Sequence, residues 1–145
     1  MAIDRPNLGL TVLRICIGVF FVFEGLGKVR WFADPSLLAA RLADWHQAAP
    51  AGSISAWYLQ RVAEPYVTIF ARLVPLGEIV TGVALVVGFW TTLFAFIGFF
   101  MALNFQLAGN MVFKYAFLTS GYGLPVLGST LALAIGGVKT RFSIR

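Results

Sequence analysis

The sequence contains few charged residues, and this shortage excludes an ordinary soluble domain. Charged residues make up 12% of the chain and hydrophobic residues 59%, whereas soluble domains are about one quarter charged and half apolar. The composition therefore indicates an integral membrane protein in contact with a lipid bilayer. The net charge is +5, but the basic residues stand near the ends of apolar runs, where they set topology and contact anionic lipid. We therefore expect no nucleic-acid partner.

Metal-binding side chains are almost absent as well. Cys16 is the only cysteine and His46 the only histidine, whereas an iron–sulfur cluster needs about four thiolates and bis-histidine haem ligation needs two imidazoles. No CxxC motif and no glycine-rich nucleotide-binding motif occurs. We therefore expect no metal site and no cofactor held covalently or by metal ligands. We expect His46 to be solvated or to cap a helix, with ligand binding or proton handling as the alternative.

Long apolar runs dominate what is present. Four of them, at about 8–29, 66–89, 91–110 and 121–138, are long enough for a bilayer crossing, which takes about 20 helical residues. The first run is too long and too charged for a cleavable signal peptide. We predict an all-α integral membrane four-helix bundle in which residues 1–145 form one transmembrane domain. Small residues that repeat every four positions should let the later helices approach closely: Gly98, Ala102, Gly128, Ala132 and Gly136.

Residues 30–65 are more polar and predict an amphipathic interfacial segment between the first two spans. One helix should begin after Asp34-Pro35 and a second after Ser53, because these residues are typical of helix starts. Tryptophan and tyrosine, which prefer the headgroup region, gather in or beside this segment: Trp31, Trp45, Trp57, Tyr58 and Tyr66. We expect the segment to lie on the membrane surface. The alternative is a small extramembrane subdomain that binds a partner.

Four spans place both termini on one side of the membrane. Basic residues are equally numerous on the two sides, with Arg5, Lys139, Arg141 and Arg145 beside the termini and Arg30, Arg41, Arg61 and Lys114 opposite. The dense C-terminal cluster and the long first loop favour cytoplasmic termini.

The first two spans carry charged residues, and each such residue at bilayer depth costs about 2.5–3.5 kcal/mol. A rise of about 1.5 Å per residue places Arg72 at the level of Glu24 and Arg14 within reach of Glu78. We therefore predict two crossed ion pairs, Glu24–Arg72 and Arg14–Glu78. Lys28 follows Glu24 by one helical turn and competes for the same carboxylate.

These charges have two interpretations. They fix the register of two helices, or they line a cavity for water, a quinone or a proton path, since intramembrane charges mark functional sites. Three amides near the end of the third span, Asn104, Gln106 and Asn110, are able to hydrogen-bond a ligand headgroup. No catalytic residue can be assigned. The candidate ligand-binding residues are Arg14, Glu24, Lys28, Arg72, Glu78, Asn104 and Gln106.

Two stretches resemble a known family. LRICIGVFFVFEGLGKVRWF (Leu13 to Phe32) and LGEIVTGVALVVGFWTT (Leu76 to Thr92) are similar to the DoxX family, which is itself similar to DoxD, the small membrane subunit of thiosulfate:quinone oxidoreductase. The motif residues that carry the resemblance are Arg14, Gly18, Gly25, Lys28, Gly77, Glu78 and Gly82. The resemblance implies a four-helix membrane bundle associated with partners that handle sulfur compounds, thiols or quinones.

From these observations we expect a membrane subunit of an electron-transfer assembly, in the cytoplasmic membrane of a bacterium or archaeon. It would line a quinone site, without being catalytic alone, and other membrane subunits would hold the redox cofactors. One alternative is a non-catalytic accessory subunit of a larger respiratory or photosynthetic complex. Another is a small-solute transporter or membrane chaperone, which the lack of inverted repeats disfavours.

Overall fold

The computed structural model describes residues 5–112 and 114–136. The elements in this part of the chain are helical, as predicted. In chain order they are α1 (Arg5–Gly27), α2 (Arg30–Ala33), α3 (Ser36–Ala48), α4 (Ile54–Tyr58), the π-helical turn η1 (Leu59–Ala63), α5 (Val67–Val87), α6 (Thr91–Ala108), α7 (Tyr115–Thr119) and α8 (Leu124–Gly136).

Three of the predicted spans are confirmed by length and apolar character. Within the described residues, Asn7–Ala33, Val67–Val87 and Thr91–Ala108 are each long and apolar enough to cross a membrane. The predicted fourth span, 121–138, is only partly matched by α8, which has 13 residues and a length of about 20 Å. Residues 121–123 form a turn before α8, and residues 137 and 138 lie outside the described part.

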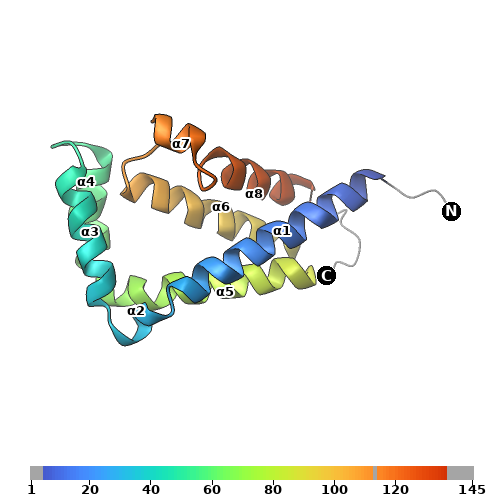
Figure 1. The fold of residues 1–145 in the computed structure, drawn as a ribbon, viewed down its shortest axis with the longest axis horizontal. Helices are drawn as coiled ribbons and strands as arrows, with labels where there is room; N and C mark the ends of the chain where they lie inside the picture. The colour runs from blue at the N-terminus through green and yellow to red at the C-terminus, as the bar shows by residue number, and fades with distance from the viewer. Residues whose placement is uncertain (1–4, 113, 137–145) are drawn as a thin grey trace.

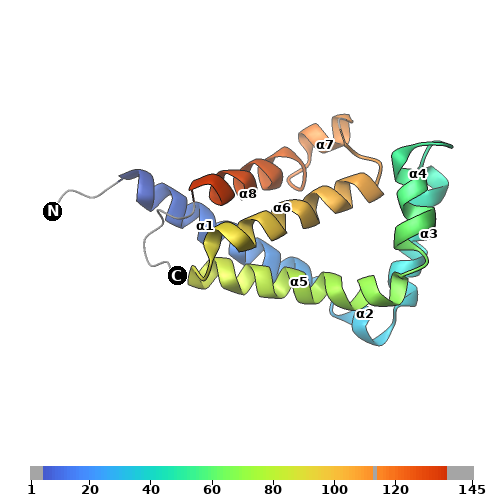
Figure 2. The same cartoon turned by 180° about the vertical axis from the view of Figure 1, so that it is seen from behind.

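Helices α1 and α5 lie side by side and α8 lies against α6, with all four long helices roughly aligned in both views (Figures 1 and 2). The backbones of α1 and α5 approach each other closely, because glycines at the contact have no side chain. A Cβ atom on Gly18 would lie 2.8 Å from the Gly82 carbonyl oxygen, and one on Gly25 would lie 2.8 Å from the Pro75 carbonyl oxygen. The two backbones therefore touch, and the register of α1 against α5 is fixed by these contacts.

The expected small-residue contacts of α8 are wrong in part. Nothing lies within 4 Å of a Cβ built on Gly128, and Ala132 is exposed. The buried face of α8 is instead formed by larger side chains, including Val126, Thr130 and Leu133. On α6 the expectation fits better, because the Phe21 ring packs directly against Gly98.

The segment between the first two spans crosses one end of the long helices, at the left of Figure 1, with α3 roughly perpendicular to them. Its apolar side packs on α5 and α6 through a cluster formed by Trp31, Leu38, Leu42, Leu59, Ala63, Ala71 and Ala108. The predicted helix starts are confirmed. The Ser53 hydroxyl accepts a hydrogen bond from the Ala56 amide, and Asp34 Oδ1 accepts one from the Ser36 amide.

Exposed aromatic side chains stand at both ends of the spans. Trp57, in the segment 30–65, is 60% exposed, and Tyr66, which directly follows this segment, is 55% exposed. At the opposite end, Phe89 and Trp90 stack at the turn between α5 and α6, where Gly88 has a positive φ of 84°. This distribution is typical of the two headgroup regions of a bilayer. Trp31 is not one of these exposed aromatic residues, because it is buried in the cluster between the segment 30–65 and α5.

Candidate functional site

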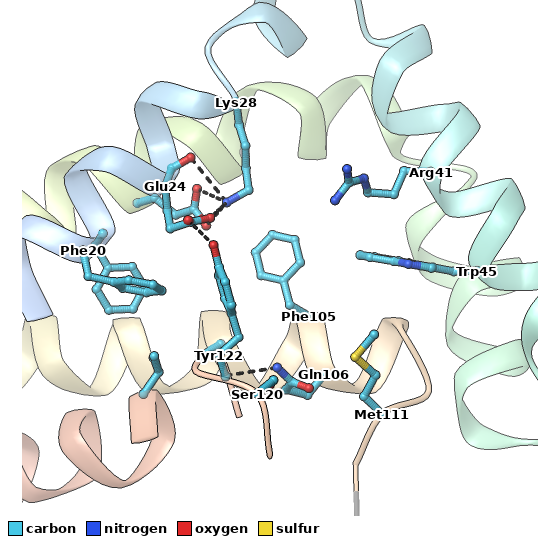
Figure 3. Close-up of a pocket in the computed structure, with 14 residues that line it drawn as sticks. Phe20, Glu24, Lys28, Arg41, Trp45, Phe105, Gln106, Met111, Ser120 and Tyr122 are labelled. Carbon is cyan, nitrogen blue, oxygen red and sulfur yellow. Dashed lines mark hydrogen bonds and ion pairs between the residues drawn. The ribbon is translucent and has the colours of Figure 1, made fainter. Parts of the chain in front are cut away.

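A central pocket with a volume of about 390 Å³ opens between α1, α5, α6, α3 and the turn before α8 (Figure 3). Its apolar walls are formed by Phe20, Phe21, Trp45, Ala102, Phe105, Met111 and Val126. Its polar side chains are Glu24, Lys28, Arg41, Glu78, Gln106, Ser120 and Tyr122. Small-molecule sites have this size and this mixture of aromatic walls and a few polar groups.

Lys28 lies between two carboxylates in this pocket. Its Nζ atom is 2.9 Å from Glu24 Oε2, one helical turn earlier in the chain. The same atom is 2.7 Å from Glu78 Oε1 and 2.8 Å from Glu78 Oε2 on α5. The side chain of Glu78 is only 4% exposed, so its charge requires a cation at hydrogen-bond distance. Lys28 provides that cation and ties α1 to α5.

Tyr122 joins the turn before α8 to this cluster. Its hydroxyl donates a hydrogen bond to Glu24 Oε1, and its ring packs edge-on against Phe20 with the centroids 5.3 Å apart. Gln106 Nε2 donates to the Tyr122 carbonyl oxygen at 3.0 Å. Two carboxylates, an ammonium and a phenol, drawn from three distant parts of the sequence, therefore form one hydrogen-bonded group.

The aromatic walls meet the charged cluster at Phe105. Lys28 Nζ lies 5.1 Å from the centre of the Phe105 ring, close enough for a cation–π contact. Trp45 packs edge-on against the same ring. Arg41, which comes from α3 like Trp45, is exposed and points toward the pocket (Figure 3).

Both predicted crossed ion pairs are wrong, because Lys28 forms the ion pairs with Glu24 and Glu78. The depth estimate also misplaced the helices relative to each other. Since Gly18 contacts Gly82, Glu78 lies about two helical turns, or roughly 12 Å, from the level of Arg14. Arg72 is exposed on α5, on a different face from the buried Ala71, Pro75 and Glu78.

Arg14 is nevertheless buried, with 2% of its surface exposed. Its Nε and Nη1 atoms have no hydrogen-bond partner among the residues described. It does not line the central pocket. The structure therefore separates Arg14 from the other predicted site residues.

Of the three predicted amides, only Gln106 lines the central pocket. Asn104 lines a second, much smaller cavity of about 20 Å³ with Tyr58 and hydrogen-bonds the Tyr58 side chain. Asn110 Oδ1 lies 3.4 Å from the Ser55 hydroxyl, at the contact between α4 and the end of α6. These two amides therefore have neighbours within the fold.

His46 pairs with Glu64 rather than standing alone. Its Nδ1 atom is 2.6 Å from Glu64 Oε1, and the two side chains are 35% and 36% exposed. The pair links α3 to the residue that follows η1. Among the described residues, no group of three or more His, Cys, Asp or Glu side chains is placed to hold a metal ion.

Sequence reasoning missed several pocket residues: Arg41, Trp45, Phe105, Ser120 and Tyr122. Trp45 was placed in the surface segment and Phe105 in the third span, but no periodicity shows that they face each other. Tyr122 lies 98 residues from its partner Glu24, beyond the stretches that carry the family resemblance. A polar residue in a turn gives no signal for such a contact.

The contact between Tyr122 and Glu24 can be tested by titration. Burial and the hydrogen bond to Glu24 raise the pKa of Tyr122 to about 12, because both disfavour the phenolate. The folded protein therefore holds this proton more tightly than the unfolded chain. The resulting stabilisation is complete below the ordinary tyrosine pKa of about 10 and is lost as the pH rises through 12. With Tyr58→Phe in the background, tyrosinate absorbance should show one late ionisation, and Tyr122→Phe should remove it.

The matched control is Tyr115→Phe, because Tyr115 is 81% exposed and does not line the pocket. This variant should keep the late ionisation. The Tyr122→Phe and Tyr115→Phe variants are best compared with Tyr58→Phe in the background, since burial also raises the pKa of Tyr58. A late step that survives Tyr122→Phe in this background would show that Tyr122 is not held by Glu24.

Comparison with known proteins identifies one family. The family model described as DoxX matches residues 9–111, a stretch that includes Glu24, Lys28, Glu78 and Gln106. No curated protein and no solved structure gave a match.

Proposed function

This chain belongs to the DoxX family, and from that premise and the central pocket we propose that it is the integral membrane subunit of an electron-transfer assembly that binds a quinone headgroup. The observation that carries the proposal is the pocket itself. Its volume of about 390 Å³ suits a single substituted ring. Phe20, Trp45 and Phe105 offer aromatic surfaces against which such a ring stacks.

The charged cluster supports the same proposal, because the reduction or oxidation of a quinone moves protons as well as electrons. Lys28, Glu24 and Glu78 form a hydrogen-bonded group beside the cavity, and such groups within membranes mark proton relays. Electrons need a separate carrier. The chain has one cysteine and one histidine, so an iron–sulfur cluster or bis-histidine haem would belong to a partner subunit.

The proposed membrane arrangement has four crossings. In it, α8 and the residues that follow form the fourth span beside α6, and the surface segment lies in one headgroup layer. Both termini then face the cytoplasm of a bacterial or archaeal cell. The surface segment would bring Arg41 and Trp45 to the rim of the pocket at headgroup depth, where a lipid-soluble ring can enter from the bilayer.

The test is a binding titration of purified protein in detergent with decylubiquinone, followed by quenching of tryptophan fluorescence. Trp45 lines the pocket and should report occupancy. Arg41→Gln should weaken binding about three- to tenfold, because a donor to a ligand oxygen is worth about 1 kcal/mol. Arg72→Gln removes the same charge from an exposed residue outside the pocket and should leave the affinity unchanged.

Two results would contradict the proposal. One is the absence of saturable binding in the wild-type protein. The other is an equal loss of affinity in the Arg41 and Arg72 variants, which would indicate a general effect of charge. Either result would favour the accessory-subunit alternative, in which the buried charges serve only to fix the helices.

A further inference from the structure

The central pocket contains two polar atoms that the fold leaves without partners. Gln106 is 5% exposed, and its Oε1 atom and the Ser120 hydroxyl have no hydrogen-bond partner in the described part of the chain. The orientation of the Gln106 amide is set by chemistry, because its Nε2 atom faces the Tyr122 carbonyl oxygen, which can only accept. The atom left open is therefore an acceptor. Buried acceptors of this kind are nearly always satisfied in folded proteins.

The strongest donor in the pocket is already used. Lys28 Nζ has three protons, and three carboxylate oxygens of Glu24 and Glu78 lie within 2.9 Å of it. The Tyr122 hydroxyl proton is committed to Glu24. The inner part of the pocket therefore offers a ligand the open acceptor Gln106 Oε1 and the Ser120 hydroxyl, which both donates and accepts.

We propose that the pocket holds a ring hydroxyl of its ligand against Gln106 Oε1 and Ser120 Oγ, and so binds the dihydroxy (quinol) form more tightly than the dicarbonyl (quinone) form. This inference rests on the proposed quinone site. A ring hydroxyl donates to Gln106 Oε1, whereas a carbonyl oxygen at the same place would face another acceptor and leave Gln106 Oε1 unsatisfied. The Ser120 hydroxyl is able to donate to the same ligand oxygen.

The position of Arg41 sets the orientation of the ring. Its guanidinium lies at the other side of Phe105 from Tyr122, next to Trp45 (Figure 3). A ring stacked on Phe105 would place one oxygen toward Gln106 and the opposite oxygen toward Arg41, which only donates. Arg41 donates a hydrogen bond to the ligand oxygen in either form, so it does not discriminate between the quinol and the quinone. The preference for the reduced form therefore comes from the Gln106 end.

The experiment compares decylubiquinol and decylubiquinone, each titrated anaerobically into the full chain in detergent. The wild-type protein should bind the quinol about tenfold more tightly, because an unsatisfied buried acceptor costs about that factor. Gln106→Leu should bring the ratio of the two affinities close to one, whereas Ser120→Ala should weaken the binding of both forms, because its hydroxyl donates to the ligand oxygen in either state. Asn104→Leu changes an amide on the same helix outside the central pocket and should preserve the ratio.

Each outcome has a distinct meaning. Equal affinities in the wild-type protein, tighter binding of the quinone, or a ratio that survives Gln106→Leu would overturn the preference while leaving the quinone site in place. The absence of binding of both forms would overturn the site and the preference together. If Gln106→Leu fails to fold, the ratio in Gln106→Met decides, since methionine keeps the length of the side chain and removes the acceptor; that ratio should also be close to one.

Discussion

Replacing Lys28 by methionine should destabilise the folded protein by about 3–5 kcal/mol, because removal of one partner leaves buried carboxylates without their counter-charge. Glu78 would lose the only cation within 4 Å of its carboxylate among the described residues. Methionine retains most of the volume and shape of the lysine stem, so the loss reports charge rather than packing. The free energy of unfolding in mixed detergent micelles, followed by circular dichroism, measures the effect.

The control for this variant removes the whole charged group. The triple change Lys28→Met, Glu24→Gln and Glu78→Gln should recover much of the lost stability, since it leaves no buried charge without a counter-charge. If the Lys28→Met protein unfolds at the same denaturant concentration as the wild-type protein, the carboxylates are not held by Lys28. If the triple variant is no more stable than the single one, packing rather than charge causes the loss.

Gly82→Ala should cost about 2–3 kcal/mol of stability, although alanine is the better helix former by about 1 kcal/mol. An added Cβ atom would lie 2.5 Å from the Val22 amide nitrogen and 2.6 Å from the Gly18 carbonyl oxygen. Both are backbone atoms of α1, so no side chain can move aside. The helices α1 and α5 must separate, and the contacts that place Glu78 beside Lys28 shift with them.

Gly128→Ala is the matched control, because it makes the same change inside α8 where nothing lies within 4 Å of the new Cβ atom. This variant should be as stable as the wild type or slightly more stable. Thermal unfolding of both variants in the same detergent gives the comparison. Equal melting temperatures for the two variants would show that α1 and α5 do not pack through Gly82.

The sequence predicted the helices and the membrane class well but paired the buried charges wrongly. Apolar runs and start signals such as Ser53 are local, and local patterns predict local structure. The pairing of Arg14 with Glu78 needed the axial offset of two helices, which depends on where Gly18 and Gly82 meet. Counting residues from the expected ends of the spans gave an offset that was wrong by about one turn.

The candidate site was predicted only in part for a related reason. Glu24, Lys28, Glu78 and Gln106 were identified because charged and amide groups are rare in apolar spans. Arg41 lies in a polar segment, and Ser120 and Tyr122 lie around the start of the predicted fourth span, where polar residues are common and carry no signal. The small size of α8 was missed for another reason, because the prediction extended the apolar run across Gly121 and Gly123, although glycine favours a turn over a helix.

The hydrogen-bonded group around Lys28 connects α1, α5 and the turn before α8, so a molecule seated among them would contact three parts of the chain at once. By mass action, any ligand that binds only the folded state protects it from unfolding, by about 2.7 kcal/mol at a concentration one hundred times its dissociation constant. Resistance to heat therefore offers a way to screen unlabelled lipid extracts for the natural occupant. The same screen on the Lys28→Met protein should lose that protection.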